Sequence, residues 1–237
     1  MPSVSSSAFE DLRAHANPTK AAFFPRFFKA GKGEYAEGDV FLGVSVPEIR
    51  LIAQKHKALS LTEIKALLAD KHHEARLLAL IILTKQYAKG NERTKATIVK
   101  FYLSQFQRIN NWDLVDTSAS QILGAHLLSR NRDTLVTFAK SKHLWTQRIA
   151  IITTHAFIRA GEYRDTLLIS EIFLTHKHDL IHKAAGWMLR EVGKRDIGVL
   201  RSFLDIHAPV MPRTMLRYAI EKMATAERRK YMDARTS

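Results

Sequence analysis

The sequence contains no cysteine, which excludes disulfide bonds, thiolate metal sites and cysteine nucleophiles and fits a reducing compartment. Glycine and proline are sparse, with 10 and 6 residues, and this favours an all-helical chain over a sandwich or barrel. The longest apolar run, residues 77–83, is far shorter than the roughly 20 residues of a membrane span. Residues 1–14 are polar and lack the apolar centre of a signal peptide. We therefore expect a cytoplasmic protein that makes no use of a membrane.

Acidic residues are also in short supply. The chain has 37 Lys and Arg against 23 Asp and Glu, a formal net charge of +14 over 237 residues. Such an excess on a folded domain indicates a polyanion binder, and nucleic acid is the partner we favour. A generally basic protein, or one that touches an anionic membrane, is the alternative. The hydrophobic fraction of 46% is enough for a packed core.

Apolar residues recur with helical periodicity along almost the whole chain, and no long period-2 alternation predicts a strand. A Gly-containing loop at residues 31–43 precedes a helix whose first turn accommodates Pro47. The predicted helices are residues 5–16, 20–29, 48–57, 61–69, 73–89, 93–108, 112–128, 132–140, 144–160, 164–175, 178–192, 197–206 and 212–223. Residues 224–237 are polar and charged, and we expect a frayed tail there.

A weak internal period links these helices. Similar segments align on positions 76, 113, 148, 183 and 217. A repeat of about 35 to 40 residues that holds two helices is typical of an α-solenoid, because each helix pair must bury its apolar face on the next. The consensus aromatics of tetratricopeptide repeats are missing, so we predict HEAT-like repeats, curved, with a basic concave groove. One domain over residues 1–237 is expected, with N-terminal helices and loop at 1–58, repeats at 59–223 and the tail at 224–237.

The most informative segment is the helix that begins at Trp112. Trp112 and Asp116 are four residues apart and share one face, while Val115, Ala119 and Ile122 form a separate apolar stripe. A carboxylate beside an accessible indole can stabilise a positive centre that forms near the ring. The structural alternative is a core tryptophan and an aspartate that pairs with an arginine or caps a helix.

Two later repeats carry similar residues. Trp187 lies about 100° from the apolar stripe of its helix, with Arg190 and Lys194 on its side, which suits contact with a nucleotide. The alternative is a Trp187 packed on the neighbouring repeat. Trp145 falls in an apolar stripe and is expected to be structural, whereas Arg148 lies at the edge of that stripe and could pair with a phosphate or an aspartate.

Other constellations are weak. His178 and His182 are four residues apart and His72-His73-Glu74 is a second histidine cluster, but neither has the spacing of a zinc site. No Gly-rich phosphate loop or Gly-x-Ser-x-Gly motif is present. We expect no metal and no cofactor.

Three motifs, taken in order and at their intervals, resemble the AlkD family of DNA alkylpurine glycosylases. They are Trp112-Asp113-x-Val115-Asp116, Trp145-x-Gln147-Arg148 and Gly186-Trp187-x-Leu189-Arg190-Glu191, and the segment Phe41-Leu42-Gly43-Val44-x-x-Pro47 resembles the family too. The similarity covers roughly residues 20 to 223. It implies a HEAT-like solenoid that binds duplex DNA and excises N3- or N7-alkylated purines without a metal or cofactor.

The resemblance also assigns roles to residues. It makes Asp116 the catalytic carboxylate and places Trp112 and Trp187 around the deoxyribose of the lesion. The DNA-binding residues that it implies are Arg148, Arg190, Lys194 and Ser45. Phe27 stands where the family can have Tyr, and Asn111 where a second Trp can occur; both departures should change the grip on DNA rather than the chemistry.

The partner that we expect is double-stranded DNA with alkylated purines, bound by a monomer in the cytoplasm at the nucleoid. A relative that grips damaged or branched DNA without cleaving it is the alternative function. A HEAT-type protein–protein scaffold is a further alternative, and it predicts little salt-sensitive DNA affinity.

Overall fold

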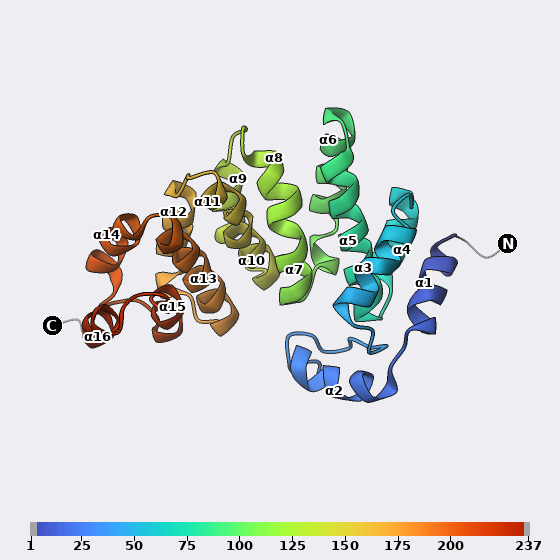
Figure 1. Ribbon diagram of the computed structural model, residues 1–237, viewed down its shortest axis with the longest axis horizontal. Coiled ribbons are helices and arrows are strands. Elements are labelled where there is room, and N and C mark those ends of the chain that lie inside the picture. The colour runs from blue at the N-terminus through green and yellow to red at the C-terminus, as the bar shows by residue number, and fades with distance from the viewer. Residues whose placement is uncertain (1–3, 235–237) are drawn as a thin grey trace. The chain divides into compact units, whose positions relative to one another are not determined.

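The computed structural model describes residues 4–234, with side chains from residue 7 onward, and its regular elements are helices (Figure 1). Within this range there is no β-strand, and Val40 and His72 form an isolated bridge. The predicted all-α class is confirmed. None of the helices in the described range is both long and apolar enough to cross a membrane.

Internal contacts divide the chain into two compact units, with the division between Ile122 and Leu123. The helices of the first unit are α1 (Val4–Ala14), α2 (Pro18–Phe28), α3 (Val46–Lys55), α4 (Leu61–Ala69), α5 (His73–Lys89), α6 (Glu92–Ser104), the 3₁₀ helix η1 (Phe106–Arg108) and α7 (Trp112–Ala119). A π-helical turn, η2 (Ser120–Gly124), crosses the division. The prediction of a single repeat domain remains a prediction.

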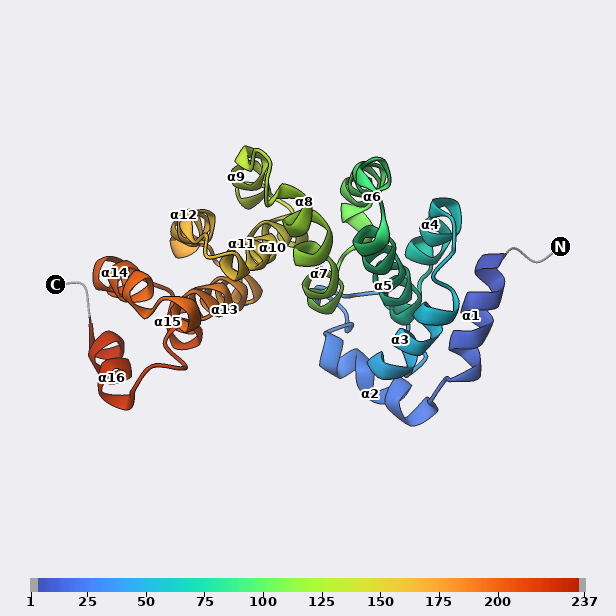
Figure 2. The same ribbon diagram turned by 45° about the horizontal axis from the view of Figure 1, so that its top comes forward.

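Helix α5 is the centre of the first unit. It contacts α1, α3, α4, α6 and α7, and Figure 2 shows it between α3, α6 and α7. Eleven consecutive residues from His73 to Leu83 are buried. A helix that is buried on all sides needs apolar residues all round, which is why this segment contains the longest apolar run of the sequence.

The second unit continues the same construction. Its elements are α8 (Ala125–Leu127), α9 (Asp133–Ala139), α10 (Leu144–Thr153), α11 (His155–Arg159), α12 (Arg164–Ile172), η3 (Phe173–Thr175), α13 (Asp179–Arg195), α14 (Ile197–His207), α15 (Arg213–Ala219) and α16 (Thr225–Asp233). Helix α13 contacts α10 and α15 in its own row and α12 and α14 in the other row (Figure 2).

The sequence period corresponds to one helix of each pair. The aligned positions 76 and 113 lie on α5 and α7 of the first unit, and positions 148, 183 and 217 lie on α10, α13 and α15 of the second. Consecutive members of these rows are in contact within each unit. The HEAT-like α-solenoid is thereby confirmed, while the curved outline and the basic groove stay predictions.

Close helix packing explains one glycine of the sequence motifs. A Cβ atom at Gly186 on α13 would lie 2.4 Å from the carbonyl oxygen of Met215 and 2.5 Å from Cβ of Tyr218, both on α15. Real Cβ atoms do not approach other atoms so closely. Gly186 therefore permits the α13–α15 contact and fixes where the neighbouring Trp187 lies.

The expected frayed tail is wrong for residues 225–233, which form α16; residues 235–237 lie outside the described range. Tyr231 is buried and its hydroxyl donates to Oδ1 of Asp205 at 2.9 Å. Arg201 pairs with Glu227 at 2.7 Å, so an ion pair and the Tyr231 hydrogen bond both join α16 to α14. The polar composition concealed this helix because one buried tyrosine supplies its apolar contact.

Candidate functional site

Helix α7 positions Trp112 and Asp116. Buried Asn111 precedes the helix and its Oδ1 accepts the backbone N–H of Trp112 at 2.8 Å. The predicted stripe of Val115, Ala119 and Ile122 is fully buried. Trp112 and Asp116 are only half-buried and lie one helical turn apart, as predicted. The carboxylate is therefore not sealed in the core.

A buried tyrosine of α6, Tyr102, is hydrogen-bonded to α7 on the buried side of that helix. Tyr102 on α6 donates its hydroxyl hydrogen to Oγ of Ser118 at 2.9 Å, because the Ser118 hydroxyl itself donates to the carbonyl of Leu114 at 2.6 Å. Burial raises the pKa of Tyr102 above its ordinary value, and the negative charge of Asp116 adds to that rise. Tyr102 thus remains a neutral donor next to Asp116.

Trp112 rests on phenylalanines of α2. The ring of buried Phe28 stacks on the indole at 5.6 Å between centroids and 20° between planes. Phe27 meets the same indole edge-on at 5.8 Å and is 50% exposed. Phe27, the position where the resembled family can have Tyr, is therefore in direct contact with Trp112 and carries no hydroxyl to offer a ligand.

A buried ion network fixes the start of α7. His73 donates from Nε2 to Oδ2 of Asp113 at 2.7 Å and from Nδ1 to Oδ2 of Asp39 at 3.2 Å. Arg76 binds the same Asp39 oxygen at 2.5 Å. Burial by itself lowers the pKa of His73, but the two carboxylates outweigh it and raise that pKa to about 9. A charged imidazolium at neutral pH thus links α5, the loop before α3 and the residue next to Trp112.

The loop that carries Ser45 is fixed by a second carboxylate. Buried Glu74 accepts the backbone N–H groups of Leu42 at 3.1 Å and of Gly43 at 2.8 Å. Gly43 has a φ of 80°, and a Cβ there would lie 2.2 Å from the carbonyl oxygen of Asn17, so a glycine is required. The backbone conformation and the close approach to Asn17 therefore explain why the motif Phe41-Leu42-Gly43 ends in glycine.

Ser45 begins α3 as its N-cap. Its hydroxyl donates to Oε2 of Glu48 at 2.5 Å, and its backbone N–H donates to the same oxygen at 2.8 Å. These bonds hold the pKa of Glu48 below its ordinary value. The side chain predicted to contact a phosphate is thus bonded within its own capping box.

Arg148, expected at the edge of the apolar stripe of its helix, is instead buried, and its pairing with a phosphate or an aspartate stays a prediction. Arg148 on α10 is 5% exposed, and Nη1 donates to the carbonyl oxygen of Leu180 at 2.7 Å. The first turn of α13 covers the guanidinium. Trp145, on the same helix, is buried as predicted.

Trp187, Arg190 and Lys194 share α13, but acidic partners accompany them. Trp187 is half-buried and donates its Nε1–H to Oε1 of Glu191 at 3.2 Å, and Lys194 pairs with Oε2 of the same carboxylate at 2.6 Å. Arg190 forms an ion pair with Glu221. Burial raises the pKa of Glu191, but Lys194 and Trp187 outweigh it and keep that pKa below its ordinary value. The expected basic face is therefore partly neutralised in this structure.

Sequence reasoning missed His73, Asp39 and Asp113 as a unit. The only signals were the His72-His73-Glu74 cluster and an aspartate next to Trp112, and the two aspartates lie 34 and 40 positions from His73 in the sequence. In the described part of the chain, no group of three or more His, Asp or Glu side chains is arranged to hold a metal ion. The predicted residues thus form two groups, Trp112 with Asp116 on α7 and Trp187 with Arg190 and Lys194 on α13.

Comparisons with known proteins identify the family and the fold. The family of DNA alkylation repair enzymes matches residues 8–223 of the chain. A predicted DNA alkylation repair enzyme from Enterococcus faecalis has a similar structure, with a TM-score of 0.70, 17% sequence identity and coverage of 89% of this chain and 98% of that one. No curated protein matches the sequence. At this identity the solved structure shows the fold, whereas the family match spans nearly the whole chain. The protein belongs to the family of DNA alkylation repair enzymes, and its role lies in the repair of alkylated DNA.

Proposed function

We propose that the protein is a monofunctional DNA glycosylase that hydrolyses the N-glycosidic bond of cationic N3- or N7-alkylated purines. The observation that carries the proposal is the placement of Asp116. Asp116 is a half-buried residue one helical turn after half-buried Trp112. Buried aromatic and charged groups hold that indole from below.

The chemistry needs little more than a fixed negative charge. An N3- or N7-alkylpurine already carries a positive charge, so it departs as a neutral base without a general acid. When the C1′–N bond breaks, positive charge develops on the deoxyribose. Asp116 stabilises that charge electrostatically, and the indole face of Trp112 adds a cation–π contribution. Water then forms the new C1′–O bond and loses a proton, which Asp116 can accept.

The remaining predicted residues are proposed to hold the DNA. In this proposal Trp187 packs against the lesion's deoxyribose, Arg190 and Lys194 bind backbone phosphates, and Ser45 binds another. Lys194 is exposed, and in this proposal it exchanges its partner Glu191 for a phosphate. Arg148 donates to the first turn of α13, the helix that carries Trp187, Arg190 and Lys194.

A single assay tests the proposal. Purified protein is incubated with duplex DNA that contains 7-methylguanine, and released base and abasic sites are measured. We expect release by the wild-type protein and a loss of 100-fold or more in Asp116→Asn, on the order of the loss of one preorganised electrostatic group. Duplex affinity of Asp116→Asn should stay close to that of wild type.

The control is Asp233→Asn, which removes the same charge from an exposed position on α16 and should leave the rate unchanged. Wild-type protein that binds methylated and unmodified duplex equally and releases no base would be a DNA-binding protein instead. Full activity in Asp116→Asn would exclude the proposed role of this carboxylate.

A further inference from the structure

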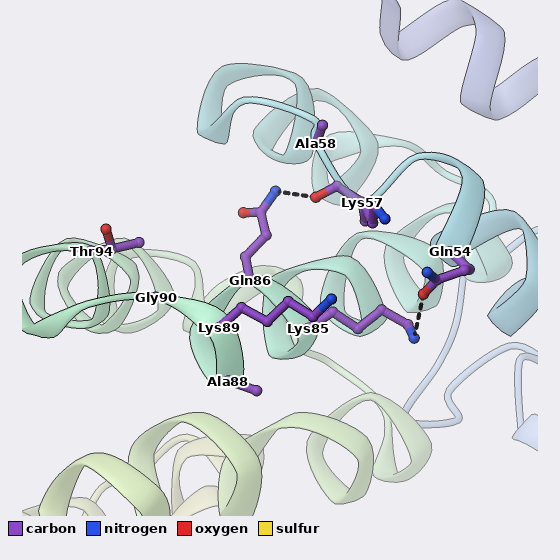
Figure 3. A pocket seen from close by; sticks show the side chains of 9 residues that line it. All are labelled: Gln54, Lys57, Ala58, Lys85, Gln86, Ala88, Lys89, Gly90 and Thr94. Atoms are coloured by element: carbon purple, nitrogen blue, oxygen red, sulfur yellow. Dashed lines mark hydrogen bonds between the residues drawn. The ribbon is translucent and has the colours of Figure 1, made fainter.

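A cavity of about 490 Å³ opens in the first unit between the C-terminal ends of α3 and α5 and the first turn of α6 (Figure 3). It contains none of the residues discussed above. The residues that line it are Gln54, Lys57, Ala58, Lys85, Gln86, Ala88, Lys89, Gly90 and Thr94. Three lysines and no acidic residue are among them.

The three lysines are not neutralised. Lys85 donates to Oε1 of Gln54 at 3.2 Å, an uncharged partner, and within residues 7–234 neither Lys85, Lys57 nor Lys89 forms an ion pair. A helix C-terminus favours cations, which accounts for lysines near the end of α5. It does not account for a third lysine from another segment at the same cavity. The lining of the cavity therefore carries an excess of positive charge, which an anion would offset.

The frame of the cavity is fixed by hydrogen bonds. Gln86 on α5 donates from Nε2 to the carbonyl oxygen of Lys57 at 2.9 Å (Figure 3). The same amide nitrogen donates to the carbonyl oxygen of Leu59 at 2.7 Å. This amide ties α5 to the turn that follows α3. Small residues, Ala58 and Ala88, leave the space open and make its walls apolar. The site therefore combines a hydrogen-bonded frame, an apolar wall and three lysines.

We propose that this cavity binds a sugar–phosphate unit of the DNA backbone at a position separate from Trp112 and Asp116. The volume lies in the range of about 300 to 1,000 Å³ of ligand pockets and exceeds what a bare phosphate needs. The ammonium groups bind the phosphate oxygens, and the alanines contact the C–H face of the deoxyribose. Backbone contacts of this kind position DNA without reading its sequence.

The cavity lies too far along α5 from the Trp112–Asp116 site to be part of that site. Lys85 and Lys89 follow His73, which binds Asp113 beside Trp112, by 12 and 16 residues on the same helix. At a rise of 1.5 Å per residue the two positions are about 18 to 24 Å apart. A phosphate bound at the cavity is therefore not the one next to a lesion at Trp112 and Asp116. The proposal requires DNA as the partner and does not require glycosylase chemistry.

The first test compares two triple variants of equal charge. Lys57→Gln/Lys85→Gln/Lys89→Gln removes the cavity cations, and Lys65→Gln/Lys71→Gln/Lys100→Gln removes three exposed lysines of the same unit that form no ion pair among the described residues. Binding to an unmodified duplex is measured by fluorescence anisotropy at a series of salt concentrations from about 50 to 300 mM. The dependence of log affinity on log salt concentration gives the salt slope. Loss of one phosphate contact should reduce the log–log salt slope by about 0.9 and weaken binding about 5- to 10-fold near 0.1 M salt.

The control variant should keep the wild-type slope. Equal effects of the two triple variants, or no effect of the cavity variant, would overturn the proposal. Because no base release is measured, a failure of the glycosylase proposal cannot be mistaken for a failure here. Circular dichroism of both variants confirms that each is folded.

The absence of cysteine permits a second test at the site itself. Ala88→Cys places one thiol at the cavity wall and Ala66→Cys places one on exposed α4. Addition of duplex DNA should slow alkylation of the thiol in Ala88→Cys several-fold and leave that in Ala66→Cys unchanged. 2-Deoxyribose 5-phosphate serves as the small probe and should protect only at far higher concentration. Equal protection of both thiols, or of neither, refutes the assignment.

Discussion

The charge of buried His73 should make the free energy of unfolding depend on pH in the alkaline range. The pKa of His73 is about 9 in the folded chain, against an ordinary value of 6.5. A difference of roughly 2.5 units at 1.36 kcal/mol per unit gives about 3 kcal/mol for a side chain that is almost wholly buried. Because the folded pKa is the higher one, this stability is fully present below about pH 6.5. It is lost as the pH rises towards 9.

The assay is urea unfolding followed by circular dichroism at intervals between pH 6 and pH 10. His73→Gln removes the titrating group, so the difference in unfolding free energy between wild type and variant isolates its contribution from those of lysines and tyrosines. We expect a difference of about 3 kcal/mol at pH 6 that shrinks markedly by pH 10. The variant retains the volume of the side chain approximately, which limits the cavity left behind.

One result would refute the reasoning. If wild type and His73→Gln differ by the same amount at pH 6 and pH 10, His73 carries no stabilising charge between Asp39 and Asp113. An NMR titration of the His73 ring gives an independent check, because its midpoint should lie near 9 rather than 6.5.

Two further predictions concern α13. Gly186→Ala should lower the free energy of unfolding by about 2 kcal/mol in urea unfolding, because its Cβ would lie 2.4 Å from the Met215 carbonyl oxygen. The control Gly198→Ala, whose Cβ would have its nearest contact at 3.2 Å, should stay within about 0.5 kcal/mol of wild type. Equal losses in the two variants would contradict the close α13–α15 packing. Glu191→Gln should tighten binding to duplex DNA up to about fivefold, as measured by anisotropy at low salt. In the wild-type protein Lys194 must break its ion pair with Glu191 before it binds a phosphate, and the variant removes that ion pair. Unchanged or weaker affinity would argue against Lys194 as a phosphate contact.

The sequence alone determined the fold class and its repeating unit. Predicted residues 61–69 and 73–89 coincide with α4 and α5, because capping residues and helical periodicity act within a few residues of chain. The period that aligns position 148 with position 183 placed both on one row of helices for the same reason. The half-exposed face of Trp112 and Asp116 also followed from spacing within one helix.

Tertiary structure decided which of these side chains are neutralised or buried. Arg148 is buried where it meets α13, and Arg190 pairs with Glu221 from the turn after α15; neither follows from spacing within one helix, because both depend on what packs against the side chain. The ion network of His73 joins residues that are distant in sequence, and only packing brings its carboxylates within 2.7 and 3.2 Å. The free energy of a buried charge depends on such partners, so the support beneath Trp112 became visible only in the folded chain.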